Sequence, residues 1–218
     1  MLQLNLVQEI AAWALPVLFA ITVHEVSHGW VARRLGDPTA EMMGRLTLNP
    51  LKHIDPIGTV LVPLIFVLLP GNFIFGWAKP VPVTWQNLRN PKRDMALVAL
   101  AGPSSNLLMA IGWGVVAKLG YLLADQVPFL GLPMIYMGSA GILINIILMV
   151  LNLLPLPPLD GGRVLAGLLP GPLAYKYSRI EPYGIVILLV LLFTGLLGGL
   201  LWPVVQGVMQ LLYSVLAL

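Results

Sequence analysis

Four long apolar runs constrain this chain more than any other feature of its sequence. They occupy residues 10–32, 95–119, 134–154 and 183–202. About 20 apolar residues of α-helix cross the hydrocarbon core of a bilayer, so each run is long enough for one span. Charged residues make up only 10% of the chain, whereas a typical soluble domain carries about 25%. The sequence therefore predicts an all-α membrane protein, a polytopic helical bundle.

The small excess of basic residues, twelve Lys and Arg against nine Asp and Glu, fits a membrane protein. Such an excess usually sets membrane topology, so we expect no nucleic-acid partner. The absence of cysteine excludes disulfides, thiolate metal ligands and a cysteine nucleophile. The first twenty residues contain Glu9 but no Lys or Arg. A secretory signal peptide is therefore not expected.

The distribution of basic residues predicts how the chain crosses the membrane. If residues 57–75 crossed, Lys and Arg would divide almost evenly between the two sides. If residues 57–83 instead form a re-entrant element of helix and strand, Lys118 alone is separated from all other basic residues. The positive-inside rule favours the second arrangement. We therefore expect an outside N-terminus, four spans ending with 183–202, and a tail, 204–218, too short to cross.

Two histidines in the first apolar run predict a metal site. His24 and His28 are four residues apart, so their side chains lie on one face of a helix. Imidazoles in that arrangement can both bind one Zn²⁺. Glu25 lies beside them, where a general base must lie to deprotonate a metal-activated water. A chance pentapeptide is the alternative, but ionisable residues inside an apolar helix are costly and usually functional.

A catalytic zinc usually has three protein ligands, so a further residue is needed. His53 is the only other histidine, and we interpret it as a loop or helix-entry contact, with a role near the site as the alternative. Among the acidic residues, only Asp160 lies where one apolar segment ends and the chain bends back into another. A helix N-cap is a compatible role for Asp160. We take it as the third ligand, with Gly161 and Gly162 allowing close backbone approach.

Five motifs in a fixed order make the chain similar to a known family. They are HEVSH at 24–28, NPLKHIDPIG at 49–58, GWAKPVPV at 76–83, AGPSSN at 101–106 and LDGG at 159–162. With these motifs the chain resembles the site-2 protease family of intramembrane zinc metalloproteases, peptidase M50. The resemblance covers about residues 20–170, and we expect a minimal form without a PDZ or CBS domain.

The resemblance implies one Zn²⁺ per chain, held by His24, His28 and Asp160, with Glu25 as the catalytic base. It implies a single transmembrane metalloprotease domain over 1–218, with a core at 10–170 and C-terminal helices at 180–218. The implied activity is regulated intramembrane proteolysis, the hydrolysis of peptide bonds within or near transmembrane segments of membrane proteins. The expected location is the cytoplasmic membrane, with the site toward the cytoplasm. A regulatory partner is left open.

Three asparagines in the apolar runs have two interpretations each. A lone Asn in a membrane helix usually binds a neighbouring helix. Asn106, one turn after Pro103, could instead hold the substrate backbone or the developing oxyanion, and this is the role that we predict. For Asn145 and Asn152 we favour helix–helix contacts.

The stretch 73–83 is a candidate clamp for the substrate. A membrane helix must be unwound before a peptide bond can be attacked, and an exposed strand edge can hold it extended by main-chain pairing. Pro80 and Pro82 remove donors from that edge. A strand that only closes the cavity is the alternative. The residues predicted to clamp the substrate are Phe75, Gly76, Trp77 and Ala78.

Two other functions would use the same residues. A metal transporter would need further ligands along a path through the membrane, but the sequence offers no second cluster of His, Asp and Glu. A proteolytically inactive scaffold is disfavoured because all four predicted active-site residues are present.

Overall fold

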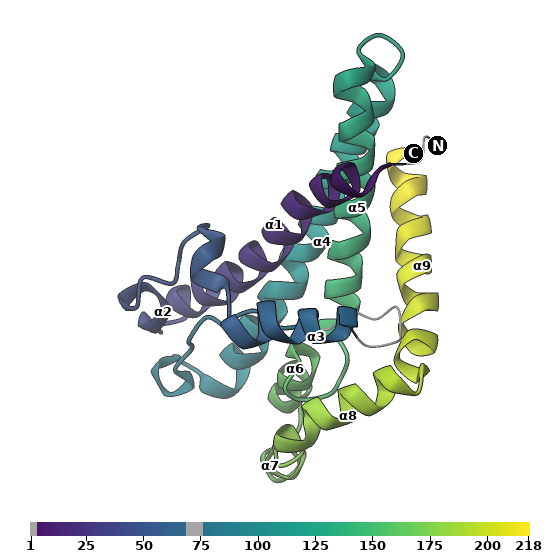
Figure 1. Cartoon of the computed structure of the whole chain (residues 1–218). Coiled ribbons are helices and arrows are strands. Elements are labelled where there is room, and N and C mark those ends of the chain that lie inside the picture. The colour runs from purple at the N-terminus through teal and green to yellow at the C-terminus, as the bar shows by residue number, and fades with distance from the viewer. Residues whose placement is uncertain (1–3, 69–75) are drawn as a thin grey trace.

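The structure, a computed structural model, describes residues 4–68 and 76–218, and within these ranges every regular element is a helix. Four helices are long and apolar enough to cross a membrane (Figure 1): α1 (Leu6–Arg34), α4 (Pro91–Leu123), α5 (Pro128–Asn152) and α9 (Leu196–Leu216). The predicted fold, a polytopic helical membrane protein, is therefore confirmed.

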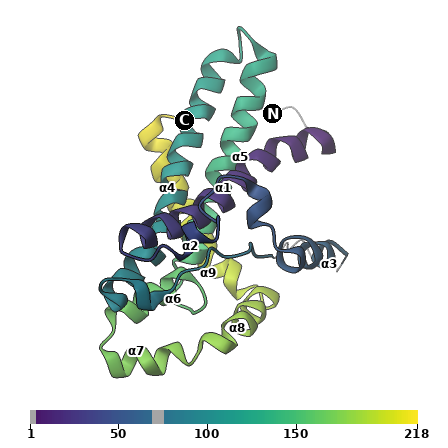
Figure 2. The same cartoon turned by 90° about the vertical axis from the view of Figure 1, so that its left-hand side faces the viewer.

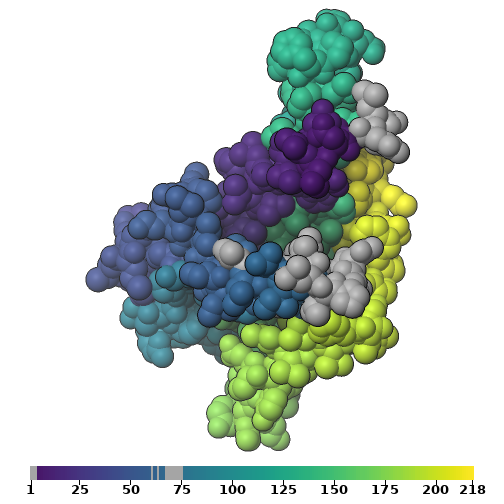
Figure 3. All heavy atoms as spheres, viewed as in Figure 1, coloured from purple at the N-terminus to yellow at the C-terminus, as the bar shows by residue number. Residues whose placement is uncertain are grey.

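Helix α4 is the centre of the bundle, because it packs against α1, α5, α6 (Asp160–Leu168) and α9. Helices α4 and α5 form a hairpin whose tip projects beyond the rest of the molecule (Figures 1 and 3). The start of α1 and the end of α9 lie at the same end of the bundle (Figure 1). This placement is what an even number of crossings requires.

A buried apolar cluster fixes α9 against the α4–α5 hairpin. Ala110 from α4 meets Ile142 and Ile146 from α5, and Val205 and Leu212 come from α9. Three of these residues are fully excluded from solvent, and Val205 is 1% exposed. Close packing of this kind is what drives helix association inside a bilayer. The last helix is thus an integral part of the bundle.

The prediction for the fourth span is wrong. The run 183–202 is broken at Gly195, which adopts a left-handed conformation (φ +75°) that glycine tolerates. Helix α8 (Glu181–Phe193) has 13 residues and is only about 20 Å long, too short for about 30 Å of hydrocarbon. Helix α9 continues through Pro203 and contains residues 204–216 of the predicted tail. A membrane helix tolerates an internal proline, which costs one backbone hydrogen bond.

The short elements gather at one end of the bundle. They are α2 (Thr39–Met42), η1 (Pro50–His53), η2 (Pro56–Leu61), α3 (Val62–Leu68), η3 (Trp85–Asn87), α6 and α7 (Gly171–Ser178). The basic residues that the sequence analysis assigned to one side belong to these elements, to the loops between them, or to the adjoining ends of α1 and α4. Lys118 lies near the other end of α4, where its ammonium group donates to the carbonyl of Leu216.

Residues on the two sides of the stretch 59–76 contact each other. The N–H of Trp77 donates to the carbonyl of Gly58 (3.0 Å), and the hydroxyl of Thr59 donates to the carbonyl of Trp77 (2.8 Å). Residues 58 and 77 are therefore neighbours, and α3 lies beside the bundle (Figure 2). This geometry supports the re-entrant arrangement.

Residues 76–84, here called the extended segment, correspond to the predicted strand. They form no helix and no ladder with another strand in the part of the chain that the structure describes, and the backbone of Thr84 at their end is extended (φ −100°, ψ 96°). Their hydrogen bonds go instead to single carbonyl and side-chain groups. Phe75, the first of the predicted clamp residues, lies outside the described residues.

Candidate metal centre

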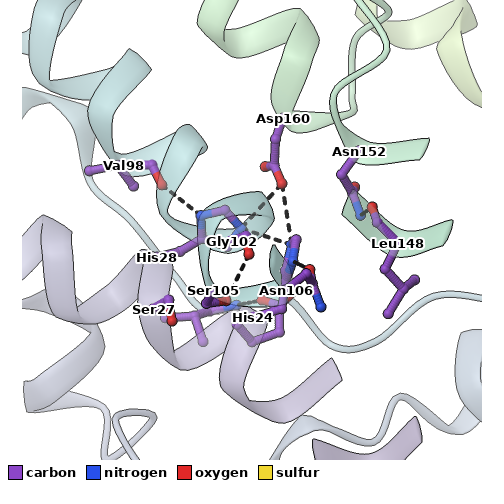
Figure 4. A network of polar contacts seen from close by, with 12 residues as sticks. His24, Ser27, His28, Val98, Gly102, Ser105, Asn106, Leu148, Asn152 and Asp160 are labelled. Atoms are coloured by element: carbon purple, nitrogen blue, oxygen red, sulfur yellow. Dashed lines mark hydrogen bonds and ion pairs between the residues drawn. The ribbon is translucent and has the colours of Figure 1, made fainter. Parts of the chain in front are cut away.

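The three predicted ligands converge although they are far apart in sequence. The Nε2 atoms of His24 and His28, both on α1, are 3.0 Å apart. Asp160, the first residue of α6, places its Oδ2 atom 3.2 Å from the Nε2 of His24 and 3.4 Å from that of His28. Figure 4 shows the carboxylate of Asp160 pointing at both rings. His24 and Asp160 are buried.

Hydrogen bonds on the far sides of the rings fix their tautomers. The Nδ1 of His28 lies 2.7 Å from the carbonyl oxygen of Val98, which can only accept, so Nδ1 carries the proton. The Nδ1 of His24 lies 2.5 Å from the Oδ1 of Asn106, and the same reasoning applies. In a neutral ring with its proton on Nδ1, the Nε2 atom carries a lone pair. The Nε2 lone pairs of His24 and His28 then point toward each other and toward Asp160.

This arrangement fits a divalent cation. In the neutral form of both rings, which is the form that binds a metal, two nitrogen lone pairs and a carboxylate oxygen face one another, and the Oδ2 atom of Asp160 is buried without a hydrogen-bond donor. Mutual repulsion of these atoms is relieved by a positive charge at their centre. Two imidazoles and a carboxylate form the donor set of many catalytic zinc sites, in which the fourth position stays open. The three side chains are the group of described residues suited to a metal ion.

Gly102 allows α4 to approach the two rings. A Cβ atom at this position would lie 2.5 Å from the Cε1 of His24 and 2.5 Å from the Nε2 of His28. No side chain larger than hydrogen fits there without moving the imidazoles. The glycine of the 101–106 motif therefore has a direct steric role at the cluster.

Asn106 of α4 is enclosed between α1 and α5. It is fully buried, and its amide group donates to the carbonyl of Ala20 (3.3 Å) and to the Oδ1 of Asn145 (2.9 Å). Asn145 in turn donates to the carbonyl of Gly141 (2.8 Å). These bonds orient the Oδ1 of Asn106 toward His24 and leave Asn106 enclosed between helices. In this arrangement Asn106 orients the ring of His24, and its contact with the substrate backbone or the oxyanion stays a prediction.

Local contacts also define the roles of Asp160, His53 and Asn152. The N-cap of α6 is Leu159, and Asp160 is the first helical residue, so Asp160 does not act as the cap. His53 is buried and its Nε2 donates to the carbonyl of Thr47 (2.9 Å), as expected for a loop contact. Asn152 donates to a carbonyl one turn earlier in its own helix (2.9 Å) and does not join the cluster (Figure 4).

Glu25 is half-buried beside the cluster and contacts the extended segment. Its Oε2 atom accepts a hydrogen bond from the N–H of Val81 (2.8 Å). The predicted clamp residues Gly76 and Trp77 are exposed, and Trp77 bonds to the start of η2. The part of the segment that contacts Glu25 is therefore Val81.

Comparison with known proteins identifies the family. Residues 121–194 match the model of peptidase family M50. YwhC of Bacillus subtilis is 39% identical over 199 residues, which cover 88% of this chain and 84% of YwhC. The chain belongs to peptidase family M50. Rip2 of Mycolicibacterium smegmatis is 33% identical over 87% of this chain and 68% of Rip2, and Rip2 of Mycobacterium tuberculosis H37Rv is 31% identical over 94% and 74%.

These three relatives are described as candidate zinc metalloproteases. No solved structure matches the chain. The predicted family, the metalloendopeptidase class and the Zn²⁺ cofactor are confirmed for this M50 peptidase. Its four long apolar helices identify it as an integral membrane protein.

Sequence reasoning did not assign the roles that several residues have at the M50 site. Gly102 was noticed only as part of the 101–106 motif, and Asn145 only as a helix–helix contact, because their roles at the site depend on which helices meet. Val81 had a signal: it is the single residue with an N–H between Pro80 and Pro82. Arg45 donates to the carbonyl of Lys79 in the extended segment (2.9 Å), but it lies in a polar loop, where a basic residue gives no signal of such a contact.

Proposed function

We propose that this M50 peptidase hydrolyses peptide bonds within or near transmembrane segments of membrane proteins, as in regulated intramembrane proteolysis. The main support for this proposal is the depth of the metal cluster below the basic end of α1. His24 precedes Arg33, at the end of α1, by nine residues, which is about 13 Å along a helix. A site at that depth is suited to a substrate that is itself in the membrane.

In the proposed mechanism His24, His28 and Asp160 hold Zn²⁺. When bound, Zn²⁺ polarises the scissile carbonyl and lowers the pKa of a water molecule. Glu25 takes a proton from the attacking water and passes it to the leaving nitrogen. The Oε2 atom of Glu25 is bonded to Val81, so we assign this proton transfer to Oε1.

The substrate must lose its helical hydrogen bonds before attack, because a membrane helix satisfies its backbone groups internally. The extended segment lies beside Glu25 and remains our candidate to hold the unwound strand, together with the predicted residues Gly76, Trp77 and Ala78. Pro80 and Pro82 have no N–H, so pairing there would use their carbonyl groups.

The proposed orientation places the site toward the cytoplasm of the cytoplasmic membrane. All basic residues except Lys118 lie at the end of the bundle where α1 finishes and α4 begins. Basic residues favour the cytoplasmic side. The surrounding partner is the lipid bilayer, and a regulatory partner remains open. A metal transporter is less well supported, since the described ranges contain one group of metal-competent side chains rather than a path of them.

The test uses purified protein in lipid nanodiscs and a fluorogenic peptide with one apolar span. The peptide carries a Gly-Ser pair near one end of the span, which weakens its helix, between a fluorophore and a quencher. We expect the zinc-loaded protein to cleave the peptide. Glu25→Gln should retain one zinc per chain and lose cleavage, whereas His24→Ala should lose both.

Mass spectrometry of proteins captured by Glu25→Gln in cells would then identify the natural substrate. Cleavage that survives in Glu25→Gln would refute the role of Glu25. Full zinc occupancy in His24→Ala would refute the ligand assignment.

A further inference from the structure

The extended segment is anchored along one edge by alternate residues. The N–H groups of Trp77, Lys79 and Val81 donate to the carbonyls of Gly58 (3.0 Å) and His53 (2.9 Å) and to the carboxylate of Glu25 (2.8 Å), respectively. This alternation is the period of an extended chain. Two of the three acceptors belong to η2 and η1, and the third is the proposed catalytic base. The segment therefore connects these two short helices to Glu25.

The sequence around Val81 isolates that one donor. Pro80 and Pro82 flank it and have no N–H. The prolines also restrict the backbone on both sides, because each fixes its own φ and limits the residue before it. The N–H of Val81 therefore has a restricted direction and no competing donor next to it.

Arg45 holds the segment immediately before Val81. Its Nη2 donates to the carbonyls of Lys79 (2.9 Å) and Pro80 (3.4 Å). Arg45 is only 8% exposed, and within the described ranges it forms no ion pair with an acidic residue. Burying a cation against neutral carbonyls costs free energy. The burial of Arg45 at these two carbonyls therefore indicates that fixing their position has a function.

The segment also docks closely on the face of α1 that carries Glu25. Gly29 is four residues after Glu25 and so lies on the same helical face, one turn later. A Cβ atom at Gly29 would lie 2.6 Å from the Cδ2 of Leu46, 2.8 Å from the Cγ1 of Val81 and 3.0 Å from the Cβ of Ala40. The absence of a side chain at Gly29 lets Val81 approach α1.

From these contacts we infer that the extended segment positions the general base: Arg45 fixes the carbonyls of Lys79 and Pro80, and the N–H of Val81 then holds one oxygen of Glu25. The other oxygen is thereby directed at the attacking water. Arg45 and Val81 are positioning residues, since neither touches the reacting atoms. The kinetic consequence rests on the proposed function, but the hydrogen bond itself does not.

The hydrogen bond is tested first, by amide hydrogen exchange without substrate. Because Pro80 and Pro82 have no amide hydrogen, mass spectrometry of fragments ending at these residues isolates exchange at Val81. Glu25→Gln keeps an acceptor oxygen and should keep the protection of Val81. Glu25→Ala removes the acceptor and should accelerate exchange by about tenfold or more. Equal exchange at Val81 in Glu25→Ala and the wild type would overturn the inference.

The kinetic test compares Arg45→Met with Arg45→Lys on the fluorogenic peptide. Methionine has similar length but no donor, whereas lysine can still bond one carbonyl. We expect Arg45→Met to bind one zinc per chain and to lower kcat by about 10- to 100-fold, with KM nearly unchanged, because a misplaced base slows the proton transfer. Arg45→Lys should recover part of kcat. Faster exchange at Val81 should accompany the loss in Arg45→Met.

Gly29→Ala serves as a second variant, should Arg45→Met fail to fold. It should lower kcat and loosen Val81 with zinc retained. Gly112→Ala on α4 is the control, since its Cβ meets nothing within 4 Å. A rise in KM alone, or loss of zinc together with kcat, would overturn the inference. If the wild type fails to cleave the peptide, the proposed function fails, while the exchange measurement still decides the contact.

Discussion

The metal cluster and the extended segment lie on two faces of the same turns of α1, yet they are held differently. His24 and His28 are fixed by helix packing, through Gly102, Asn106 and the backbone of α4. Glu25 is held by irregular backbone, which depends on the buried polar side chains of Arg45 and Asp37. One region relies on close steric fit, and the other on hydrogen bonds to single groups.

This difference separates zinc binding from catalytic turnover. Damage to the helix contacts should remove the metal, whereas damage to the anchors of the extended segment should leave the metal and slow the reaction. The following substitutions test that separation.

Gly102→Ala should have the largest effect. The new Cβ would overlap both imidazoles, so we expect the zinc affinity to fall by more than about 100-fold and cleavage to be lost. Zinc per chain, measured by mass spectrometry after dialysis, is the readout. Gly112→Ala, on the same helix but in open space, should keep its zinc. A zinc-replete Gly102→Ala would show that the rings are not confined by α4.

Asn106→Leu should weaken zinc binding by about 10- to 100-fold, because residues that orient a ligating histidine typically contribute that much. Asn145→Leu acts through Asn106 and should have a smaller effect. Both follow from the buried chain of hydrogen bonds that ends at the Nδ1 of His24. Competition with a chelator of known affinity measures both. A larger loss of zinc affinity in Asn145→Leu than in Asn106→Leu would contradict the assigned order of these hydrogen bonds.

Asp37→Ala should destabilise the protein by about 2–3 kcal/mol, because it leaves donors of the half-buried Thr39 and Thr84 without their acceptor. The carboxylate of Asp37 is fully buried and accepts from the N–H of Thr39 (3.1 Å), the N–H of Thr84 (2.7 Å) and the side chain of Asn87 (3.0 Å). Thermal unfolding in detergent measures the loss. Zinc affinity at temperatures where the protein stays folded should be unchanged, which distinguishes this anchor from the cluster.

The same residue predicts a dependence on pH. Burial alone would raise the pKa of Asp37, but hydrogen bonds from Thr39, Asn87 and Thr84 outweigh it and lower the pKa from its ordinary value of 3.8. The stabilisation that the ionised carboxylate of Asp37 provides is therefore complete above about pH 4. It is lost as the pH falls through the lower pKa that Asp37 has in the folded state. The stability difference between wild type and Asp37→Asn should shrink below pH 4. A constant difference down to pH 2 would contradict this.

Arg33→Ala should have the smallest effect. Arg33 pairs with Glu41 at 2.6 Å, but both side chains are about half exposed. Exposed ion pairs contribute about 0–1 kcal/mol. We expect a change in thermal midpoint that is barely measurable and that vanishes in high salt. A loss as large as that of Asp37→Ala would mean that exposed charges, rather than buried anchors, hold this end of the molecule.

The sequence predicted those parts of the fold that follow from local pattern. Three spans and the convergence of His24, His28 and Asp160 were accessible, because run length and side-chain chemistry indicate them directly. The fourth span was misplaced because two helix-breaking residues, Gly195 and Pro203, lie in that region. In an isolated helix, proline is the stronger helix breaker of the two. The backbone at Gly195 and the packing of Val205 and Leu212 on α4 and α5 decided otherwise.

The site was predictable to the level of ligands but not of their supports. Asn106 could be noticed as a polar residue in an apolar helix, but its partners lie on α1 and α5, which no local pattern reveals. The same holds for Arg45, whose role depends on where the extended segment passes.

X-ray absorption at the zinc edge tests the central claim most directly. For the zinc-loaded protein we predict two imidazole ligands with Zn–N distances of about 2.0–2.1 Å, and oxygen donors completing the site. His53→Ala should leave the spectrum unchanged, while His28→Ala should remove one imidazole. A spectrum with three imidazoles, or one that His28→Ala does not alter, would contradict the account.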